Sequence, residues 1–298
     1  MTMKLAIFDV NNAACSLAVC PNGYSLMVDC GCHNEKACPV DTIHSLKSGF
    51  LGMKQYNGYD LTLLHITHPD DDHVGNAVKI KEKLPPYLLH RRQHEEFPIT
   101  ENIHDDYKKH IDLKYRGNPI GFTFGFDQNK TFQIPMNTIL KDEELSKKVK
   151  NNSSILRFIE YGGKKVLFGG DLEKTGWDWL AKNHQDFVNT MKNGLDFLIA
   201  PHHGHKSGFP TSLFDLISKV EISILSKASE SEKEDTDVSS QYSQYSKGVF
   251  YTNLNDNQRY FADGTLTTRS NGNIFLTISK EGNINIFTQK ASSNHTKI

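Results

Sequence analysis

The sequence predicts an α/β protein, and three features of the chain support this class. Short apolar runs typical of strands alternate with stretches of helical periodicity along the 298 residues. The order of strands, helix and strands occurs twice. No linker rich in Pro, Gly or Ser separates the two parts. We therefore expect residues 1–290 to form one domain of two similar halves, followed by a frayed tail at 291–298.

The first half is expected to open with a meander of three strands, because turn residues separate its strand-like runs. Pro21-Asn22-Gly23 gives the strongest turn signal. A helix follows, then a buried strand that leads into His68, and a second helix that stops before Pro85-Pro86. The expected strands are 5–10, 16–20, 24–28, 61–67 and 87–90, and the expected helices are 41–51 and 74–83.

The second half repeats this order after a less regular stretch at 87–150. In that stretch the pattern indicates helices at 101–113 and 142–149 and a strand at 131–134. Residues 228–246 are rich in Ser, Glu, Gln and Tyr, which predicts a mobile loop or an irregular helix. The remaining expected strands are 154–161, 165–168, 195–200, 222–225, 248–252, 272–279 and 283–287, with helices at 175–184 and 210–218.

The composition argues against a globally basic protein and against a membrane-spanning one. The net charge is −1 and the pI is near 6.9, so any attraction of nucleic acid must depend on local basic patches. The longest apolar stretches are far shorter than the roughly 20 residues that a spanning helix needs. The N-terminal segment reaches Asp9 without the apolar core of a signal peptide, so we expect a cytoplasmic protein.

The cysteines do not match a disulfide framework, because their number is odd and they are crowded near the N-terminus. They are Cys15, Cys20, Cys30, Cys32 and Cys38. Free thiols in a reducing cytosol are the favoured interpretation. The alternative, a zinc knuckle formed by Cys30, Cys32, His33 and Cys38, lacks the paired spacing of structural zinc sites.

Residues 68–73 read His-Pro-Asp-Asp-Asp-His and give the strongest signal for a functional site. All but the proline are potential metal ligands. Removing so many charges from water is unfavourable unless a cation compensates them. Alternate residues of a tight loop can converge, so His68 with Asp70, and Asp72 with His73, are expected to serve two adjacent metals. The alternative is a solvated acidic loop in which Asp72 caps the next helix.

Two later strand ends carry further candidates. Asp171 follows a Gly-Gly pair, which lets the backbone approach a site closely, and its carboxylate is well placed to bridge two cations. An ordinary turn with an Asp cap is the alternative there. His202, His203 and His205 follow the apolar run 195–200, which favours ligands over surface histidines.

His65 lies in the strand before the cluster, where an apolar residue is expected. The alternation of side chains along a strand, and its offset of three residues from His68, point it elsewhere. A core or supporting histidine is therefore favoured over a ligand.

Together these segments resemble the metallo-β-lactamase superfamily. Residues 68–75 are similar to its signature H-x-H-x-D-H-x-G, with Asp70 in place of the second histidine. Segments between about residues 5 and 225 also resemble, in the same order, the hydrolase domain of ComEC-type competence proteins. These segments are 8–10, 27–31, 152–154, 167–173 and 201–207. The resemblance implies a four-layer αββα sandwich, a two-metal centre at one edge of the sheets, and cleavage of phosphodiester bonds in nucleic acid.

The resemblance also assigns residues to roles. The implied metal ligands are His68, Asp70, Asp72, His73, Asp171 and His203. His203 is preferred over His202 because it directly precedes the matching glycine, which leaves His202 as a supporting or rim residue, with His205. Asn152 and Ser153 stand where other branches carry a further ligand histidine, so one metal lacks a nitrogen ligand. Lys206 matches a recurrent lysine that would stabilise phosphate charge.

The implied reaction is hydrolysis of a phosphodiester by a hydroxide held between two divalent cations, Zn²⁺ or Mn²⁺. Asp72 would orient this hydroxide and take its proton, or protonate the leaving group. Nucleic acid or a nucleotide is the expected substrate, although segments 11–14 and 228–237 differ from the competence branch. Two other classes stay open: a hydrolase of thiolesters, lactones or β-lactams on the same fold, and a catalytically silent binding or regulatory module. A regulatory protein partner, or residues 228–246 acting as a lid, would provide control.

Overall fold

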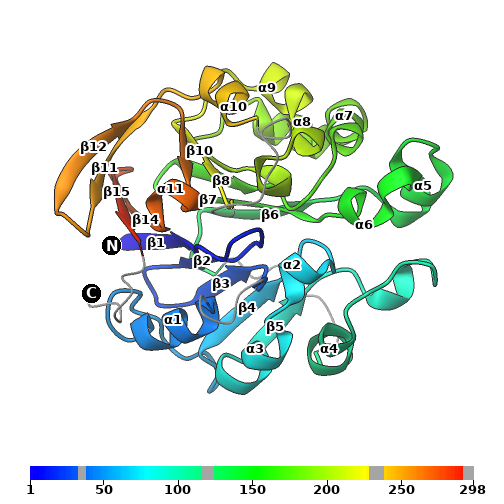
Figure 1. The fold of residues 1–298 in the computed structure, drawn as a ribbon, viewed down its shortest axis with the longest axis horizontal. Coiled ribbons are helices and arrows are strands. Elements are labelled where there is room, and N and C mark those ends of the chain that lie inside the picture. The colour runs from blue at the N-terminus through cyan, green and yellow to red at the C-terminus, as the bar shows by residue number, and fades with distance from the viewer. Residues whose placement is uncertain (33–37, 116–123, 228–237, 291–298) are drawn as a thin grey trace.

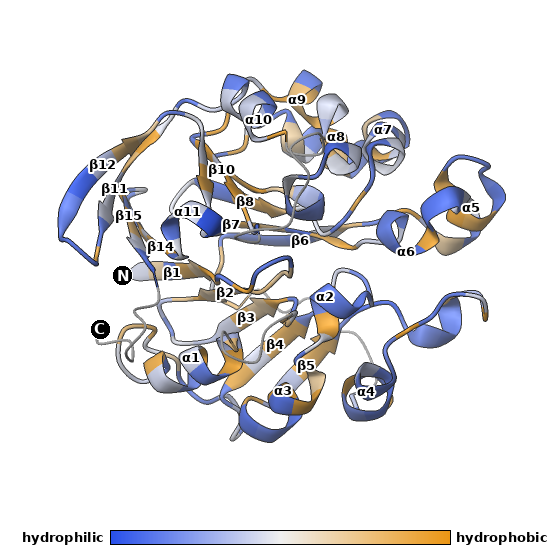
Figure 2. Ribbon diagram, viewed as in Figure 1, coloured by the Kyte–Doolittle hydropathy of each residue, from blue (hydrophilic) through white to orange (hydrophobic). Residues whose placement is uncertain are grey.

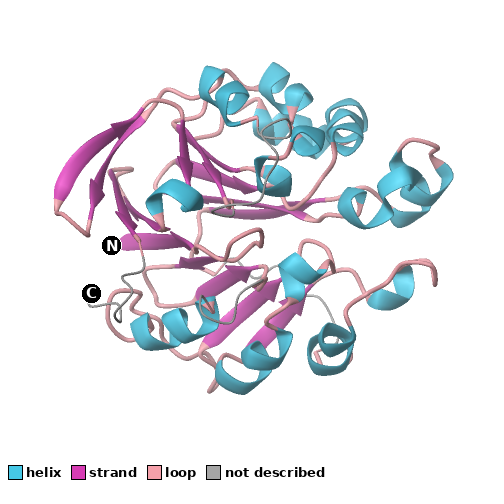
Figure 3. Cartoon of the chain, viewed as in Figure 1, coloured by secondary structure: helices cyan, strands magenta, loops and turns pink. Residues whose placement is uncertain are grey.

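The computed structural model describes residues 1–32, 38–115, 124–227 and 238–290. Two β-sheets lie face to face, and helices cover the outer face of each (Figures 1 and 3). Helices α1, α3 and α4 lie against one sheet, and α7, α8, α9 and α10 lie against the other (Figure 1). The predicted four-layer αββα class is confirmed. The predicted tail at 291–298 lies outside the described residues.

The larger sheet contains nine strands in the order β12-β11-β15-β14-β1-β2-β3-β4-β5. It joins the beginning of the chain to its end, because β1 pairs with β14 in antiparallel register. Its strands are β1 (Thr2–Ile7), β2 (Ser16–Val19), β3 (Ser25–Val28), β4 (Leu61–His65), β5 (Pro86–His90), β11 (Val249–Asn253), β12 (Gln258–Ala262), β14 (Asn273–Ser279) and β15 (Ile284–Gln289).

The smaller sheet contains six strands in the order β13-β10-β9-β8-β7-β6. Most of them come from the middle of the chain, and only β13 returns from the C-terminal part. The strands are β6 (Gln128–Phe132), β7 (Leu156–Tyr161), β8 (Lys164–Phe168), β9 (Phe197–Ile199), β10 (Ile222–Leu225) and β13 (Thr265–Thr267).

The two sheets repeat one pairing pattern. In the larger sheet β1, β2 and β3 form an antiparallel meander, and β4 and β5 then add in parallel. In the smaller sheet β6, β7 and β8 form the meander, and β9 and β10 add in parallel. The sequence predicted two similar halves, and this repeat is their structural form.

A core of apolar side chains fills the space between the sheets. Alternate residues of facing strands point into it, as the period of two along a strand requires. Leu5 of β1, Leu63 of β4, Val166 of β8 and Ile222 of β10 all belong to this core and are buried. A second core lies between the sheets and the helices, and it includes Trp177. Figure 2 shows hydrophobic residues concentrated along the central strands of both sheets.

The helices are shorter and more numerous than the sequence predicts. Only the helices predicted at 41–51, 175–184 and 210–218 have one counterpart each. The helices are α1 (Pro39–Leu46), α2 (Asp71–Val74), α3 (Ala77–Lys83), α4 (Asp105–Tyr107), α5 (Met136–Lys141), α6 (Val149–Asn152), α7 (Lys174–Asn183), α8 (Gln185–Met191), α9 (Thr211–Leu216), α10 (Ser239–Gln244) and α11 (Thr268–Asn271).

The predicted helix at 74–83 is wrong in its first part. The chain breaks after α2 because Asn76 donates its backbone N–H to the Cys30 carbonyl instead of to a helical partner. The predicted helix at 101–113 begins only at Asp105 and continues as a π-turn over Lys108–Asp112. Helices α5 and α8 and strands β12 and β13 were not predicted.

Residues 228–246 are predicted to form a mobile loop or an irregular helix; the described part, from residue 238, contains a helix, and 228–237 lies outside the described residues. Residues 239–244 form α10, and its Tyr242 is fully buried against Phe209 and Phe214. These aromatic contacts fix the segment to the body of the protein, so a lid cannot include α10 without breaking them.

All five cysteines are free thiols, as predicted. Cys38 donates its Sγ–H to the Asn76 side chain, and no cysteine in the described part of the chain belongs to a group of potential metal ligands. The zinc-knuckle alternative therefore has no support there, although its His33 lies outside the described residues. None of the described helices is long and apolar enough to cross a bilayer.

Candidate metal centre

Four chain segments meet at the edge of the sandwich where parallel strands end. They follow β3, β4, β8 and β9, and they carry Asp29, residues 68–73, Asp171 and residues 202–203. Parallel neighbours in a sheet end at the same edge, which brings these segments together from both sheets. The three predicted constellations therefore form one cluster.

Backbone contacts clamp the 68–73 segment in place. Cys30 donates its backbone N–H to the His73 carbonyl at 2.8 Å, and Ala14 donates to the Asp72 carbonyl at 2.9 Å. Gly31 makes this approach possible, since a Cβ on it would lie 1.5 Å from the Asp72 carbonyl oxygen. The side chains of Asp72 and His73 are thus held on a rigid backbone.

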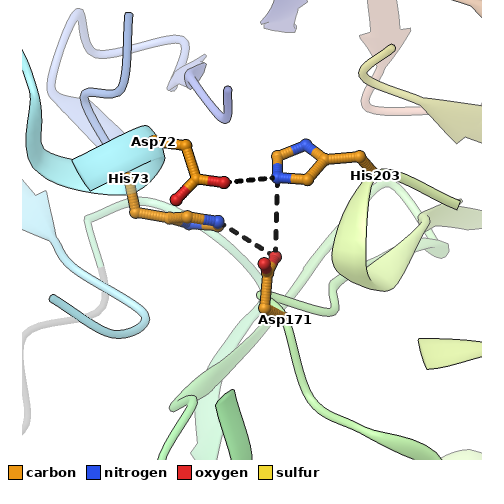
Figure 4. Close-up of side chains that lie close together, drawn as sticks. All are labelled: Asp72, His73, Asp171 and His203. Carbon is orange, nitrogen blue, oxygen red and sulfur yellow. Dashed lines mark hydrogen bonds and ion pairs between the residues drawn. The ribbon is translucent and has the colours of Figure 1, made fainter. Parts of the chain in front are cut away.

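The central group contains Asp72, His73, Asp171 and His203 (Figure 4). One oxygen of Asp171, Oδ1, lies 2.9 Å from His73 Nε2 and 3.8 Å from His203 Nε2. His203 Nε2 also lies 3.2 Å from Asp72 Oδ2. All four potential ligand atoms lie within 4.8 Å of one another.

The other oxygen of Asp171 faces a second group. Its Oδ2 lies 4.0 Å from His68 Nε2 and 3.8 Å from His202 Nε2. His68 Nε2 lies 3.4 Å from Asp70 Oδ2, and the Asp70 carboxylate also forms an ion pair with Lys150. Asp171 therefore stands between two groups of imidazoles and carboxylates.

Asp29 is a supporting residue to which the sequence analysis gave no role. It is buried, and its Oδ2 lies 2.8 Å from His73 Nδ1. It also accepts hydrogen bonds from the backbone N–H and the hydroxyl of Thr67, both at 2.8 Å. A carboxylate on Nδ1 fixes the tautomer of a histidine and leaves Nε2 free to bind a metal. The signals in the sequence were an acid directly after a strand and its place in segment 27–31, which resembles the competence-type hydrolase domain.

The charges of the cluster shift its pKa values strongly. Burial would lower the pKa of His73, but Asp171, Asp29 and Asp72 hold it well above its usual range. Burial would raise the pKa of Asp171, but His73 and His203 hold it well below its usual range. The pKa of Asp72 is also held below its usual range, because His73 and His203 outweigh the effect of burial. For Asp70, His68 and Lys150 outweigh burial and bring the pKa to about 2.

These residues fit a bound cation. His68 Nε2, His73 Nε2 and Asp171 Oδ1 are buried and make no well-oriented hydrogen bond among the described residues, although His73 Nε2 and Asp171 Oδ1 face each other as an ion pair at 2.9 Å. Such orphaned atoms are rare unless an ion or water satisfies them. A cavity of about 30 Å³, lined in part by Asp29, His73, Asp171 and His203, lies beside them. Imidazole nitrogens and carboxylate oxygens are the donors that Zn²⁺ and Mn²⁺ accept.

Some predicted site residues lie outside the cluster. Asn152 donates to the Leu145 carbonyl and Ser153 to the Lys150 carbonyl, so both side chains serve their own turn. The neighbouring Ser154 reaches the site instead, because its hydroxyl accepts the backbone N–H of Asp171 at 3.1 Å. Asp71 is exposed and makes no ion pair with another described residue.

The segment after β9 places its polar residues at different depths. His203 is buried in the central group, whereas His202 is about a quarter exposed. His205 hydrogen-bonds Ser207 and packs against the ring of His202. Lys206 is exposed, and no contact joins it to the cluster in the described part of the chain.

His65 is engaged in a separate buried network. Its Nε2 lies 2.9 Å from the Ile155 carbonyl, so this nitrogen must carry the proton. Its Nδ1 therefore accepts, from Arg157 at 3.1 Å and from His90 Nδ1 at 2.9 Å. Burial and the Arg157 charge lower the pKa of His65 well below its usual range and that of His90 to about 3. The favoured prediction of a core histidine agrees with this arrangement.

Comparison with known proteins assigns the family. The model of the metallo-beta-lactamase superfamily matches residues 9–217. The chain belongs to this superfamily. The predicted family is therefore confirmed, and the superfamily is one of metal-dependent hydrolases.

Two curated relatives match part of the chain. ComE operon protein 3 of Bacillus subtilis (strain 168) is 28% identical over 177 residues, which is 58% of this chain and 20% of that protein. Recombination protein 2 of Haemophilus influenzae is 28% identical over 185 residues, which is 58% of this chain and 19% of that protein. The chain thus spans about a fifth of the length of these relatives. The predicted resemblance to competence-type proteins is confirmed.

Solved structures of the superfamily are similar at low sequence identity. The metallo-beta-lactamase fold protein YhfI from Bacillus subtilis is 13% identical, and the match covers 95% of this chain and 98% of that chain with a TM-score of 0.44. A metallo-beta-lactamase from Thermotoga maritima is 15% identical, covering 64% of this chain and 92% of that chain, with a TM-score of 0.39.

Proposed function

We propose that this protein hydrolyses phosphodiester bonds in nucleic acid or a nucleotide, using two divalent cations. The position of Asp171 carries the proposal. One of its oxygens faces His73 and His203, and the other faces His68 and His202. A buried carboxylate that turns its two oxygens to two separate groups of donors is suited to bridge two cations.

Each cation would have its own set of donors. Asp72, His73 and His203 would hold one, His68 and Asp70 would hold the other, and Asp171 would bridge them. Both Zn²⁺ and Mn²⁺ are compatible with these nitrogens and oxygens. Cations bound there would lower the pKa of water toward about 7 and polarise the scissile phosphate.

The protein's own groups complete the proposed chemistry. Asp72 is partly exposed, and its Oδ2 is paired with His203, so its other oxygen can take the proton of the attacking water. Asp29 holds His73 from behind and keeps its ring fixed during the reaction. Lys206 lies exposed on the 202–206 segment and would reach the phosphate of a bound substrate.

The similarity to competence-type proteins supports nucleic acid as the substrate class. One relative is named for recombination. The segment that the superfamily model matches, residues 9–217, contains every proposed ligand. The superfamily fold itself hosts many hydrolytic reactions, so the fold alone does not select the substrate.

A substrate panel tests the proposal. Purified protein with Mn²⁺ or Zn²⁺ is assayed on bis(4-nitrophenyl) phosphate and on single- and double-stranded DNA and RNA. A β-lactam, a lactone and a thiolester form the comparison set. We expect metal-dependent cleavage of the phosphodiesters only. Asp72→Asn should reduce the rate by at least about 100-fold, as for loss of a general base.

Asp71→Asn is the matched control, because it removes the neighbouring but exposed carboxylate of the same segment. Its activity should stay within about twofold of wild type, as for surface substitutions generally. Hydrolysis of the lactam, lactone or thiolester without cleavage of any phosphodiester would overturn the proposed substrate class. A protein that binds metal and cleaves nothing would favour the regulatory-module alternative.

A further inference from the structure

His202 faces the cation position that the sequence leaves short of a nitrogen ligand. Residues 152 and 153 carry no histidine, and the structure turns both side chains away. His202 Nε2 lies 3.8 Å from Asp171 Oδ2, and His68 Nε2 lies 4.0 Å from that same oxygen. Two imidazoles therefore approach the outer oxygen of the bridging carboxylate from different segments.

The sheet register shows that His68 and His202 occupy corresponding places. Val28 pairs with His65 at the end of β4, and Phe168 pairs with Ile199 at the end of β9. His68 follows the first paired end by three residues, and His202 follows the second by three residues. The repeated strand pattern thus delivers one imidazole from each half of the molecule to Asp171.

The ring of His202 is held in the manner of a metal ligand. Its Nδ1 lies 3.0 Å from the Ser207 hydroxyl and 3.4 Å from Glu173 Oε1. Glu173 is itself fixed by a hydrogen bond from the Asn151 side chain at 2.9 Å. His73, with Asp29 on its Nδ1, has the same arrangement. Acceptors on Nδ1 leave the Nε2 lone pair directed at the site.

The backbone is strained to bring this ring to the site. His202 has φ +48° and ψ +45°, a left-handed conformation that non-glycine residues seldom adopt. Its N–H donates to the Gly170 carbonyl at 2.8 Å, which ties it to the Asp171 segment. Gly208 leaves room for it, since a Cβ there would lie 2.7 Å from the His202 Cβ. Strain of this kind clusters at functional sites.

We propose that His202 is a metal ligand, and that it supplies the missing nitrogen to the cation held by His68, Asp70 and Asp171. This rests on the two-cation centre of the proposed function. Each cation then receives two imidazole nitrogens and two carboxylate oxygens, with Asp171 shared. The sequence-based prediction of a supporting or rim role for His202 is replaced by a direct one.

Metal binding, not activity, tests the proposal. Full-length protein freed of metal by a chelator is titrated with Zn²⁺ by calorimetry and with Co²⁺ by visible absorption. Wild type should bind two equivalents per chain. In His202→Ala the affinity for one equivalent should fall by at least about 10-fold, while the affinity for the other stays unchanged. The visible spectrum of the Co²⁺-bound protein should also change.

Two further variants keep the result interpretable. His202→Gln preserves much of the side-chain volume and should weaken the same equivalent, so a folding defect in the alanine variant would not decide the outcome. His44→Ala removes an exposed histidine of α1 and should leave both equivalents unchanged.

The proposal is overturned if both equivalents bind His202→Ala and His202→Gln with wild-type affinity. A change in KM alone would then make His202 a substrate contact. It is also overturned if wild type binds a single equivalent. If wild type binds two equivalents but cleaves no phosphodiester, the proposed function is refuted. The titration of the His202 variants then decides the ligand assignment by itself.

Discussion

The two halves of the molecule have the same strand pattern but use its acidic residues differently. In each half the third strand ends in an aspartate beside the site, Asp29 after β3 and Asp171 after β8. Asp29 is fully engaged by the protein, because Thr67 and His73 supply its hydrogen-bond partners. Asp171 keeps one buried oxygen, Oδ1, that makes no well-oriented hydrogen bond among the described residues and faces His73 Nε2 only as an ion pair.

This difference separates a supporting carboxylate from a binding one. A buried aspartate surrounded by N–H and O–H donors is stabilised without an ion. One surrounded by Nε2 atoms and other carboxylates gains stability only from protons or a cation. Position at a strand end is therefore insufficient to assign a ligand, and the partners of each oxygen decide the role.

The fourth strands of the two halves, β4 and β9, also end in residues with different roles. Strand β4 ends in His65 and β9 ends in Ile199, although the register makes these residues equivalent. His65 bonds to Ile155 and Arg157 of the opposite sheet, so it joins the halves. Both of its ring nitrogens are hydrogen-bonded to protein groups, whereas Nε2 of His68 makes no hydrogen bond among the described residues.

The largest effect is expected from Asp171→Asn. The amide replaces the shared negative charge, so we expect loss of at least one of two bound metals per chain and a fall in kcat/KM of about 10³-fold or more. Elemental analysis and a phosphodiester assay measure the two effects. Wild-type metal content in this variant would remove Asp171 from the bridging role.

Asp29→Asn should have a smaller effect on the same site. The change disturbs the tautomer and position of His73 without removing a ligand, so we expect metal affinity to fall by about 10- to 100-fold. Chelator competition measures the affinity. A loss as large as that of Asp171→Asn would contradict the distinction between the two aspartates.

The smallest effect is expected from the buried histidine network, and it concerns stability. The pKa of His90 is lowered to about 3 in the folded protein, against about 6.5 when unfolded. The contribution of the neutral histidine to the stability of the fold is fully present above about pH 6.5. Below it the unfolded chain binds more protons, so stability should fall at up to about 1.4 kcal/mol per pH unit for each such histidine.

Urea unfolding of wild type and His90→Asn at several values between about pH 7 and pH 5 measures this slope. The asparagine retains an N–H for His65 Nδ1 but does not titrate in that range. The free energy of unfolding of the variant should therefore fall less steeply between about pH 6.5 and pH 5, by the contribution of one histidine. Its metal affinity should stay unchanged. Equal slopes would show that His90 does not carry the effect.

The sequence predicted most of the strands, the fold class and the three segments of the centre. These follow from local patterns: β10 was predicted to the residue, and the His/Asp-rich segments stand directly after apolar runs. The helices were less predictable, because contacts distant in sequence end them. The bond from Asn76 to Cys30 interrupts one helix, and no local pattern encodes it.

The supporting residues were missed for a related reason. Asp29 and Glu173 are recognised only by the ring nitrogens they face, which belong to residues far along the chain or across a turn. Ser154 differs from Ser153 by one position, and only the turn after α6 determines which hydroxyl meets Asp171. Side-chain direction of this kind requires the three-dimensional structure.

The pairing of β1 with β14 has a consequence for biosynthesis. Thr2 lies opposite Ser279, so one edge of β1 has no partner until β14, which begins at Asn273, has left the ribosome. At roughly 5–20 residues per second this takes on the order of tens of seconds. During that time the nascent chain exposes a strand edge with unpaired backbone N–H and C=O groups, the kind of surface that promotes aggregation and recruits chaperones.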